Sequence, residues 1–125
     1  MLTGLTDTQI RSQLTRTSAA WWHVAHVTPI PYFRPPYGTT NSRVERIAGQ
    51  LGYRYTALWN VDPRDWSGIS LSQVVHNVLS ATRRGGIVVM HMKSVTAQAL
   101  PAITSGLRRR GLEPVSLPAL IAAGR

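Results

Sequence analysis

Segments with helical spacing alternate with short strand-like segments along the chain, and this alternation constrains the fold more than any other feature. Helices are predicted at about residues 7–22, between Asn41 and Gly52, between Ser70 and Gly85, and at about 96–110 and 118–123. Strands are predicted at residues 32–34, 53–61, 87–90 and 114–117. Strict alternation implies parallel strands that are joined by right-handed crossovers. The sequence therefore predicts an α/β fold.

Local signals support several of these boundaries. Thr6 and Gln9 have the spacing of a capping box, and either residue of Thr40-Asn41 can cap the second helix. The run Ile87–Met90 is apolar throughout, which is typical of a parallel strand that is covered on both faces.

Length and composition indicate one domain without disulfides. A chain of 125 residues falls within the usual size of one domain, so we expect residues 1–125 to form a single domain. The chain contains no cysteine, which excludes disulfides and thiolate metal sites. No apolar run is long enough to span a membrane, and the first residues lack the pattern of a signal peptide.

The chain is strongly basic, with thirteen Arg and one Lys against five acidic residues and a net charge of +9. Such an excess favours anionic partners. The only clusters, Arg83-Arg84 and Arg108-Arg109-Arg110, fall at predicted helix ends, where cations complement the helix dipole. Helix-end stabilisation and a binding patch are both open, although no nucleic-acid-binding motif supports the patch.

Polar residues follow three predicted strands at the point where each strand ends. Arg34 precedes two prolines, Asp62–Trp66 follows the second strand, and His91 follows the third. Because the carboxyl ends of parallel strands lie on one face, we expect these three loops to converge. Histidine is the usual acid or base near neutral pH, so His91 is the acid–base candidate, and Asp65 could orient it in its protonated form.

Arg34-Pro35-Pro36-Tyr37, Asp62-Pro63-Arg64-Asp65-Trp66 and Val89-Met90-His91 follow one another in the order and at the spacing of three motifs of a known family. They resemble Arg-x-Pro-Tyr, Asp-x-x-Asp-Trp, and a hydrophobic residue followed by any residue and His. These are the third, fourth and fifth motifs of the polysaccharide deacetylases of the NodB-homology type, carbohydrate esterase family 4. The resemblance covers nearly the whole chain and implies a partial (β/α) barrel that lacks its opening strands.

The resemblance implies catalytic roles in metal-assisted hydrolysis of N-acetyl groups on amino-sugar polymers. His91 would protonate the departing amine, and Asp65 would pair with His91 and keep it charged. The backbone N–H of Tyr37 would stabilise the oxyanion. Arg34 would hold the base Asp of the family's first motif.

The same motifs imply substrate contacts. Trp66 and Val89 would wall the pocket for the acetyl methyl group, and Pro36 and Asp62 would be further substrate-binding residues. Met92 stands where the family commonly has an Asp after the His of the fifth motif. The expected partner is an N-acetylated amino-sugar polymer, and a nucleic acid is not expected.

Two family motifs are not found in the sequence. The first, of the Thr-Phe-Asp-Asp type, supplies the base and a metal-binding Asp, and the second, His-x-x-x-His, supplies two metal ligands. His23 and His26 have the wrong spacing for the second motif, and no nearby carboxylate completes a ligand set. We therefore expect an N-terminally truncated domain that binds no metal itself, whereas the complete family domain takes zinc or a similar divalent ion.

These absences lead us to expect little hydrolase activity from the chain alone. A misplaced start, a split gene with a partner chain, and a degenerate fragment are alternative explanations. A non-catalytic polysaccharide-binding remnant that contacts sugar through Trp66 and Tyr37 is the second functional hypothesis. The resemblance implies action outside the cytoplasm at the cell wall, whereas the first residues lack the pattern of a signal peptide, so the location stays open.

Overall fold

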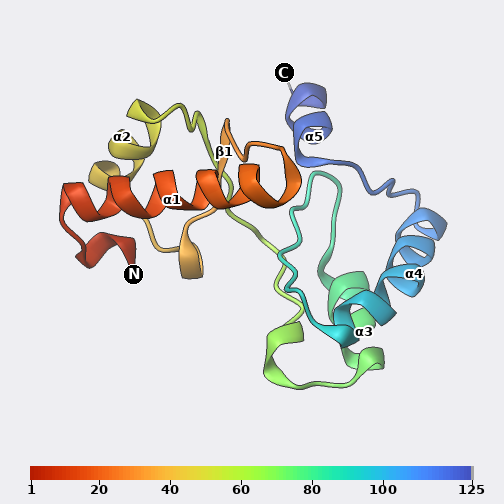
Figure 1. The fold of residues 1–125 in the computed structure, drawn as a ribbon. Coiled ribbons are helices and arrows are strands. Elements are labelled where there is room, and N and C mark those ends of the chain that lie inside the picture. The colour runs from red at the N-terminus through yellow and green to blue at the C-terminus, as the bar shows by residue number, and fades with distance from the viewer. Residues whose placement is uncertain (125) are drawn as a thin grey trace. The chain divides into compact units, whose positions relative to one another are not determined.

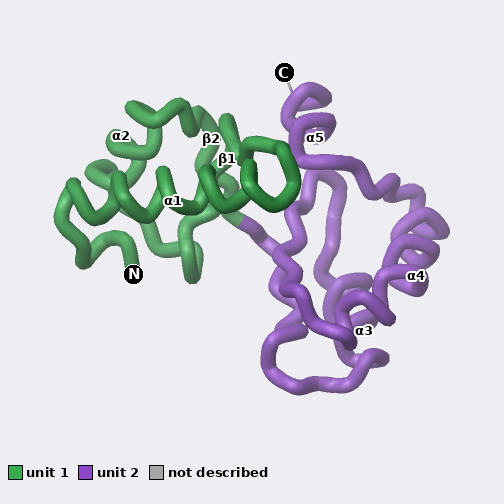
Figure 2. The backbone as a smooth tube through the Cα atoms, in the orientation of Figure 1, with its two compact units in different colours: residues 1–58 green, residues 59–125 purple. Residues whose placement is uncertain are grey.

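The structure is a computed structural model that describes residues 1–124, and it divides between Leu58 and Trp59 into two compact units (Figure 2). The first unit contains α1 (Asp7–Ala25), β1 (Tyr32–Phe33), α2 (Ser42–Gln50) and β2 (Tyr55–Thr56), and the second contains α3 (Leu71–Ala81), α4 (Ser94–Arg109) and α5 (Leu117–Ala123) (Figure 1). Short 3-10 turns occur at Leu2–Gly4, Pro36–Gly38 and Asp65–Ser67. Two compact units can belong to one domain, so this division does not test the expectation of a single domain, which stays a prediction. Among the described residues, no helix has both the length and the apolar character needed to cross a membrane.

Helix α1 begins with the predicted capping box. The Thr6 hydroxyl accepts a hydrogen bond from the Gln9 N–H at 3.3 Å, and the Gln9 side chain accepts one from the Thr6 N–H at 2.9 Å. The side chains of Ile10 and Leu14 in the first half of the helix are buried, whereas the side chain of Trp21 in the second half is exposed. The helix thus extends three residues beyond its predicted end at Trp22, to Ala25.

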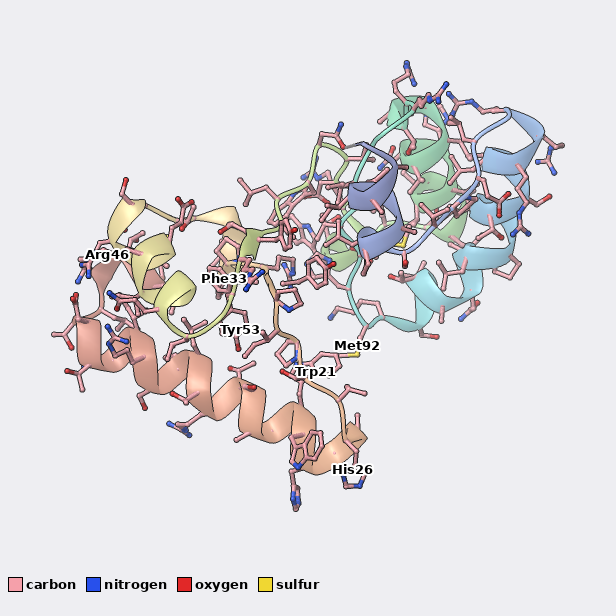
Figure 3. All side chains as sticks on the ribbon, turned by 90° about the horizontal axis from the view of Figure 1, so that it is seen from above. Trp21, His26, Phe33, Arg46, Tyr53 and Met92 are labelled. Atoms are coloured by element: carbon pink, nitrogen blue, oxygen red, sulfur yellow. The ribbon has the colours of Figure 1, made fainter. Side chains whose placement is uncertain are left out.

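A parallel strand pair and two helices form the core of the first unit. Tyr32 pairs with Tyr55 and Phe33 pairs with Thr56. The Phe33 and Tyr53 rings lie 6.0 Å apart between centroids (Figure 3). Other buried side chains come from both helices: Ile10, Leu14, Val44, Ile47 and Ala48.

Both strands of this pair are shorter than predicted. Arg34 falls outside β1, because the next two residues are prolines and have no N–H to extend the ladder. Tyr53 falls outside β2, because its N–H donates to the Ala48 carbonyl at the end of α2. Of the two residues that could cap α2, Thr40 and Asn41, the structure uses Asn41, whose side chain accepts from the Val44 N–H at 3.0 Å.

Helices α3 and α4 pack side by side and form the core of the second unit (Figure 1). Ser70 caps α3 as predicted, by accepting from the Gln73 N–H at 3.2 Å. The fully or nearly fully buried side chains of this core are Val74, Val78, Ala99, Ile103 and Leu107.

The predicted strand at Ile87–Met90 is reduced to one parallel bridge, between Val61 and Val88. The Val61 N–H donates to the Ile87 carbonyl, and the Val89 N–H donates back to the Val61 carbonyl. Only Val89 of this run is buried. The expectation of a continuous parallel strand over Ile87–Met90 is therefore wrong for this structure, because only Val88 of the run forms a bridge among the described residues.

The predicted strand at Pro114–Leu117 is also absent, and α5 begins there instead. The Ser116 hydroxyl accepts from the Ala119 N–H at 3.4 Å, and Pro118 lies in the first turn, where its missing N–H costs nothing. Local capping favours a helix at this position. The helix predicted at 118–123 is confirmed.

Candidate acid–base site

A tightly bonded loop at residues 62–67 turns Asp65 into the interior of the second unit. The Asp62 carboxylate accepts from the Arg64 N–H at 2.8 Å, and Arg64 has a left-handed backbone with φ of 60°. The Arg64 carbonyl accepts from the Ser67 N–H and hydroxyl at 3.0 and 2.7 Å. Asn77 on α3 donates to the Pro63 carbonyl at 2.9 Å and ties the loop to the helix core.

Asp65 receives three hydrogen bonds from two other segments. Its Oδ1 lies 2.7 Å from His91 Nδ1, and its Oδ2 accepts from the His91 backbone N–H at 2.8 Å and from the Thr96 hydroxyl at 2.6 Å. The Asp65 side chain is 0% exposed, whereas the His91 side chain is 35% exposed. A buried carboxylate therefore holds a histidine that reaches the surface.

The electrostatics of this cluster favour an ionised Asp65. Burial by itself raises the pKa of the Asp65 carboxyl. The hydrogen bonds from Thr96, from the His91 backbone and from the His91 ring, together with the charge of His91, outweigh burial and hold this pKa below its usual value. An ionised carboxylate only accepts hydrogen bonds, so His91 Nδ1 carries a proton and Nε2 is the nitrogen left to exchange one.

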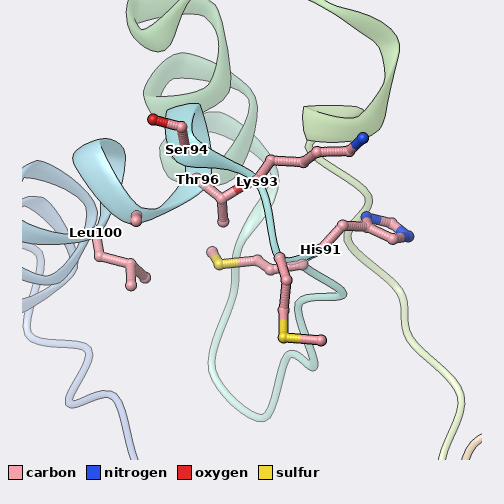
Figure 4. A pocket seen from close by; sticks show the side chains of 8 residues that line it. His91, Lys93, Ser94, Thr96 and Leu100 are labelled. Atoms are coloured by element: carbon pink, nitrogen blue, oxygen red, sulfur yellow. The ribbon is translucent and has the colours of Figure 1, made fainter.

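His91 borders an open pocket at the start of α4 (Figure 4). The Lys93 N–H donates to the His91 carbonyl at 2.8 Å, which fixes the turn between the two residues. Figure 4 shows the Lys93 side chain and the His91 ring leaving the same segment. The pocket is lined by Met90, His91, Met92, Lys93, Ser94, Thr96, Ala97 and Leu100.

The sequence-predicted residues of the third motif lie in the first unit, which we describe by itself. Tyr37 is 83% exposed and has a left-handed backbone with φ of 59°. The hydrogen bonds of this turn come from the Gly38 and Thr39 N–H groups, not from Tyr37. Pro36 and Arg34 are exposed. The Tyr37 N–H thus takes no part in the backbone hydrogen bonds of its own turn.

The remaining predicted substrate contacts lie in the second unit. Trp66 is 52% exposed and follows Asp65 directly along the chain. Val89 is buried and Asp62 is exposed. The structure thus brings Asp65 and His91 together, whereas the substrate-binding roles of Trp66, Val89, Pro36 and Asp62 stay predictions.

Thr96 is the site residue that sequence reasoning missed. It is buried, and it donates to the same carboxylate that holds His91. A signal for it exists in the helix pattern, because Thr96 precedes the buried Ala99 by three residues and Ile103 by seven. A hydroxyl on the buried face of a helix needs a polar partner, and Asp65 is that partner.

The described residues do not fit a catalytic metal ion. Among residues 1–124, no group of three or more His, Asp or Glu side chains is placed to hold one. Asp65 is already occupied by three donors. His23 lies in the last turn of α1 and His26 ends that helix.

Comparison with known proteins identifies the family. The sequence model of the polysaccharide deacetylases matches residues 1–56. A family 4 carbohydrate esterase from Streptomyces lividans superposes with a TM-score of 0.82 at 31% identity, over 92% of this chain and 59% of that one. The chain belongs to the polysaccharide deacetylase family. The predicted partial (β/α) barrel of this family is thereby confirmed.

Three further proteins show how similar this chain is to known polysaccharide deacetylases and their relatives. A bifunctional xylanase/xylan deacetylase of Cellvibrio japonicus is 35% identical over 90% of this chain and 17% of its own length. A peptidoglycan-N-acetylglucosamine deacetylase of Bacillus cereus is 26% identical over 95% of this chain and 44% of its own. A family pseudoenzyme from Bacillus anthracis has a TM-score of 0.86 at 27% identity, over 94% of this chain and 41% of that one. The chain spans less than two thirds of each of these proteins.

Proposed function

We propose that this chain supplies the proton-donating part of a polysaccharide deacetylase site that hydrolyses N-acetyl groups on amino-sugar polymers. The observation that carries the proposal is the His91–Asp65 pair, in which a buried carboxylate binds Nδ1 of an imidazole that is 35% exposed, at 2.7 Å. Chitooligosaccharide and peptidoglycan deacetylases among the relatives support this substrate class. An extracytoplasmic site of action is part of this proposal and rests on the family resemblance alone.

The geometry suits His91 to the role of general acid. Cleavage of an acetamide C–N bond releases an amine, which needs a proton as it departs. His91 Nε2 can donate that proton, while ionised Asp65 orients the ring through Nδ1 and stabilises its positive charge. The hydrogen bond from Thr96 favours the ionised form of Asp65. Asp65 is the positioning residue in this scheme.

Members of this family are generally metal-dependent, but the described residues do not form a group that fits a metal. We therefore assign no step of the proposal to a metal ion. Any metal ligands would come from outside residues 1–124, for example from a partner chain. The chain by itself is then expected to release little acetate.

A specific observation supports a second function, in which the chain binds polysaccharide without hydrolysing it. The family pseudoenzyme from Bacillus anthracis is similar in structure to this chain. Trp66 offers an exposed indole one residue after Asp65 in the chain, and an exposed aromatic ring can pack on the apolar face of a sugar. Oligomer binding that is unchanged in His91→Ala and Asp65→Asn, without acetate release, would favour this function.

The test combines an acetate assay with NMR on the chain, on His91→Ala and on Asp65→Asn. The substrates are N-acetylglucosamine oligomers, peptidoglycan fragments and acetylated xylan, each with and without added zinc. We expect oligomers to shift the His91 ring signals, with little acetate release. Acetate release that His91→Ala abolishes would establish the catalytic role in the chain alone. No shift of the His91 signals and no acetate release with any substrate would refute both functions.

A further inference from the structure

The two arginine clusters of the sequence, Arg83-Arg84 and Arg108-Arg109-Arg110, meet at one end of the second unit. Arg110 at the end of α4 donates to the Leu79 carbonyl in the last turn of α3, and at 3.1 Å to the Thr82 carbonyl just beyond it. Arg83 donates to the Ser80 and Thr82 carbonyls at 2.7 and 3.0 Å. Helices α3 and α4 therefore end together, and the five arginine residues of the two clusters lie at this end.

Helix-end stabilisation explains only part of this charge. Arg83 and Arg110 satisfy carbonyls at the end of α3, and Arg108 pairs with Glu113 at 2.8 Å. Glu113 offsets one positive charge, and two helix C-termini offset about one more in total. An excess of about three positive charges is left on exposed side chains.

Two arginines of the cluster are not needed to hold the helices. Arg84 makes no hydrogen bond or ion pair with any residue of 1–124, and Arg109 bonds only to the Ser105 hydroxyl on its own helix, at 2.6 Å. Both side chains are exposed. Their guanidinium groups can bind an external carboxylate or phosphate through two parallel N–H donors.

We propose that this arginine cluster is a second binding surface, and that it takes an anionic glycan carrying carboxylate or phosphate groups. The proposal rests on the proposed function, because the family acts on polysaccharides and a charged glycan is the polyanion such a protein meets. The surface is separate from the acid–base site. His91 lies before the first turn of α4 and the cluster lies at its last turn, and a helix of 16 residues is about 24 Å long.

This separation gives the surface a distinct use. A glycan held by the cluster would stay near the protein between encounters with His91, because a second point of attachment raises the local concentration of the polymer. The attraction would be electrostatic and would weaken with salt. It would require no acetyl group on the bound segment.

The experiment measures binding of the 125-residue chain to oligogalacturonate, a carboxylated glycan, at several salt concentrations. The test variant is Arg84→Gln/Arg109→Gln, which leaves the helix-capping arginines intact. The matched control is Arg16→Gln/Arg54→Gln, which removes the same charge from exposed positions of the first unit. Circular dichroism checks that both variants keep the helical content of the chain.

We expect the test variant to lower the slope of log affinity against log salt by about 2, one for each lost contact, and the control to leave it nearly unchanged. Equal losses in the two variants would mean diffuse charge and would overturn the proposal. So would tighter binding of a single-stranded oligonucleotide of equal charge, which would identify a nucleic-acid surface. The readout needs no turnover, so failure of the acetate assay and failure of this proposal are distinguishable.

Discussion

Replacing Thr96 by Val tests the central claim about the buried carboxylate. Valine has nearly the shape of threonine, but it removes the hydroxyl that donates to Asp65 at 2.6 Å. A hydrogen bond to a charged group contributes about 1.5–3 kcal/mol, and a buried methyl group in place of the hydroxyl returns up to about 1 kcal/mol. We therefore expect the free energy of unfolding of the second unit to fall by about 0.5–3 kcal/mol at pH 7.

The loss should depend on pH in a direction fixed by Asp65. Folding lowers the pKa of Asp65 below 3.8, its value in the unfolded chain. The ionised carboxylate therefore adds its full stabilisation above pH 3.8, and this stabilisation is lost as the pH falls through the lower pKa of the folded protein. The Thr96 bond contributes to this lowering. The cost of Thr96→Val should therefore shrink as the pH falls below about 3.8.

The assay is urea unfolding followed by the methyl NMR signals of Val78 and Ile103, which report the core of the second unit. Thr104→Val is the control, because Thr104 lies on the same helix and its hydroxyl bonds only to neutral carbonyls, at 2.9 and 3.1 Å. The reasoning is refuted if both variants cost the same at pH 7, or if the cost of Thr96→Val is unchanged in acid.

Three further substitutions test the elements that support the site. Thr6→Ala removes the cap of α1 and should cost about 1 kcal/mol, seen as a lower midpoint for the helical signal in urea. Ile103→Ala leaves a cavity between α3 and α4 and should cost about 2–5 kcal/mol in the same NMR titration, and a loss below that range would mean loose packing. Asn77→Ala removes the bond to Pro63 and should cost about 1 kcal/mol. Amide exchange at Ser67 should then quicken, and an unchanged rate would show that the loop holds itself.

The helix starts could be predicted because their causes are local. Thr6, Asn41 and Ser70 each bond to an N–H three residues later, so the sequence contains both partners. The approach of Asp65 to His91 could also be predicted, although the two residues are 26 apart. Both follow strand-like segments, and the carboxyl ends of parallel strands lie on one face.

Strand lengths could not be predicted, because a strand is defined by partners that the local sequence does not contain. Ile87–Met90 has the composition of a central strand, yet it makes a single bridge to Val61. Pro114–Leu117 has apolar residues but no partner strand among the described residues, so the Ser116 cap sets its structure. The role of Thr96 could not be predicted from the sequence, because it depends on where the Asp65 carboxylate lies.

Asp65 links the stability of the second unit to the chemistry proposed for His91. Its three donors come from residues 91 and 96, so the loop at 62–67, the end of the apolar run and the first turn of α4 must all be in place for the imidazole to be oriented. Loss of the oligomer-induced shift of the His91 ring signals in an Asp65 variant would therefore mix unfolding with lost orientation. Thr96→Val separates the two, because it removes one hydrogen bond from the Asp65 carboxylate and leaves both partners of the contact between Asp65 and His91 Nδ1 in place. If Asp65 orients His91, the His91 ring signals of this variant still shift with N-acetylglucosamine oligomers wherever the unit stays folded.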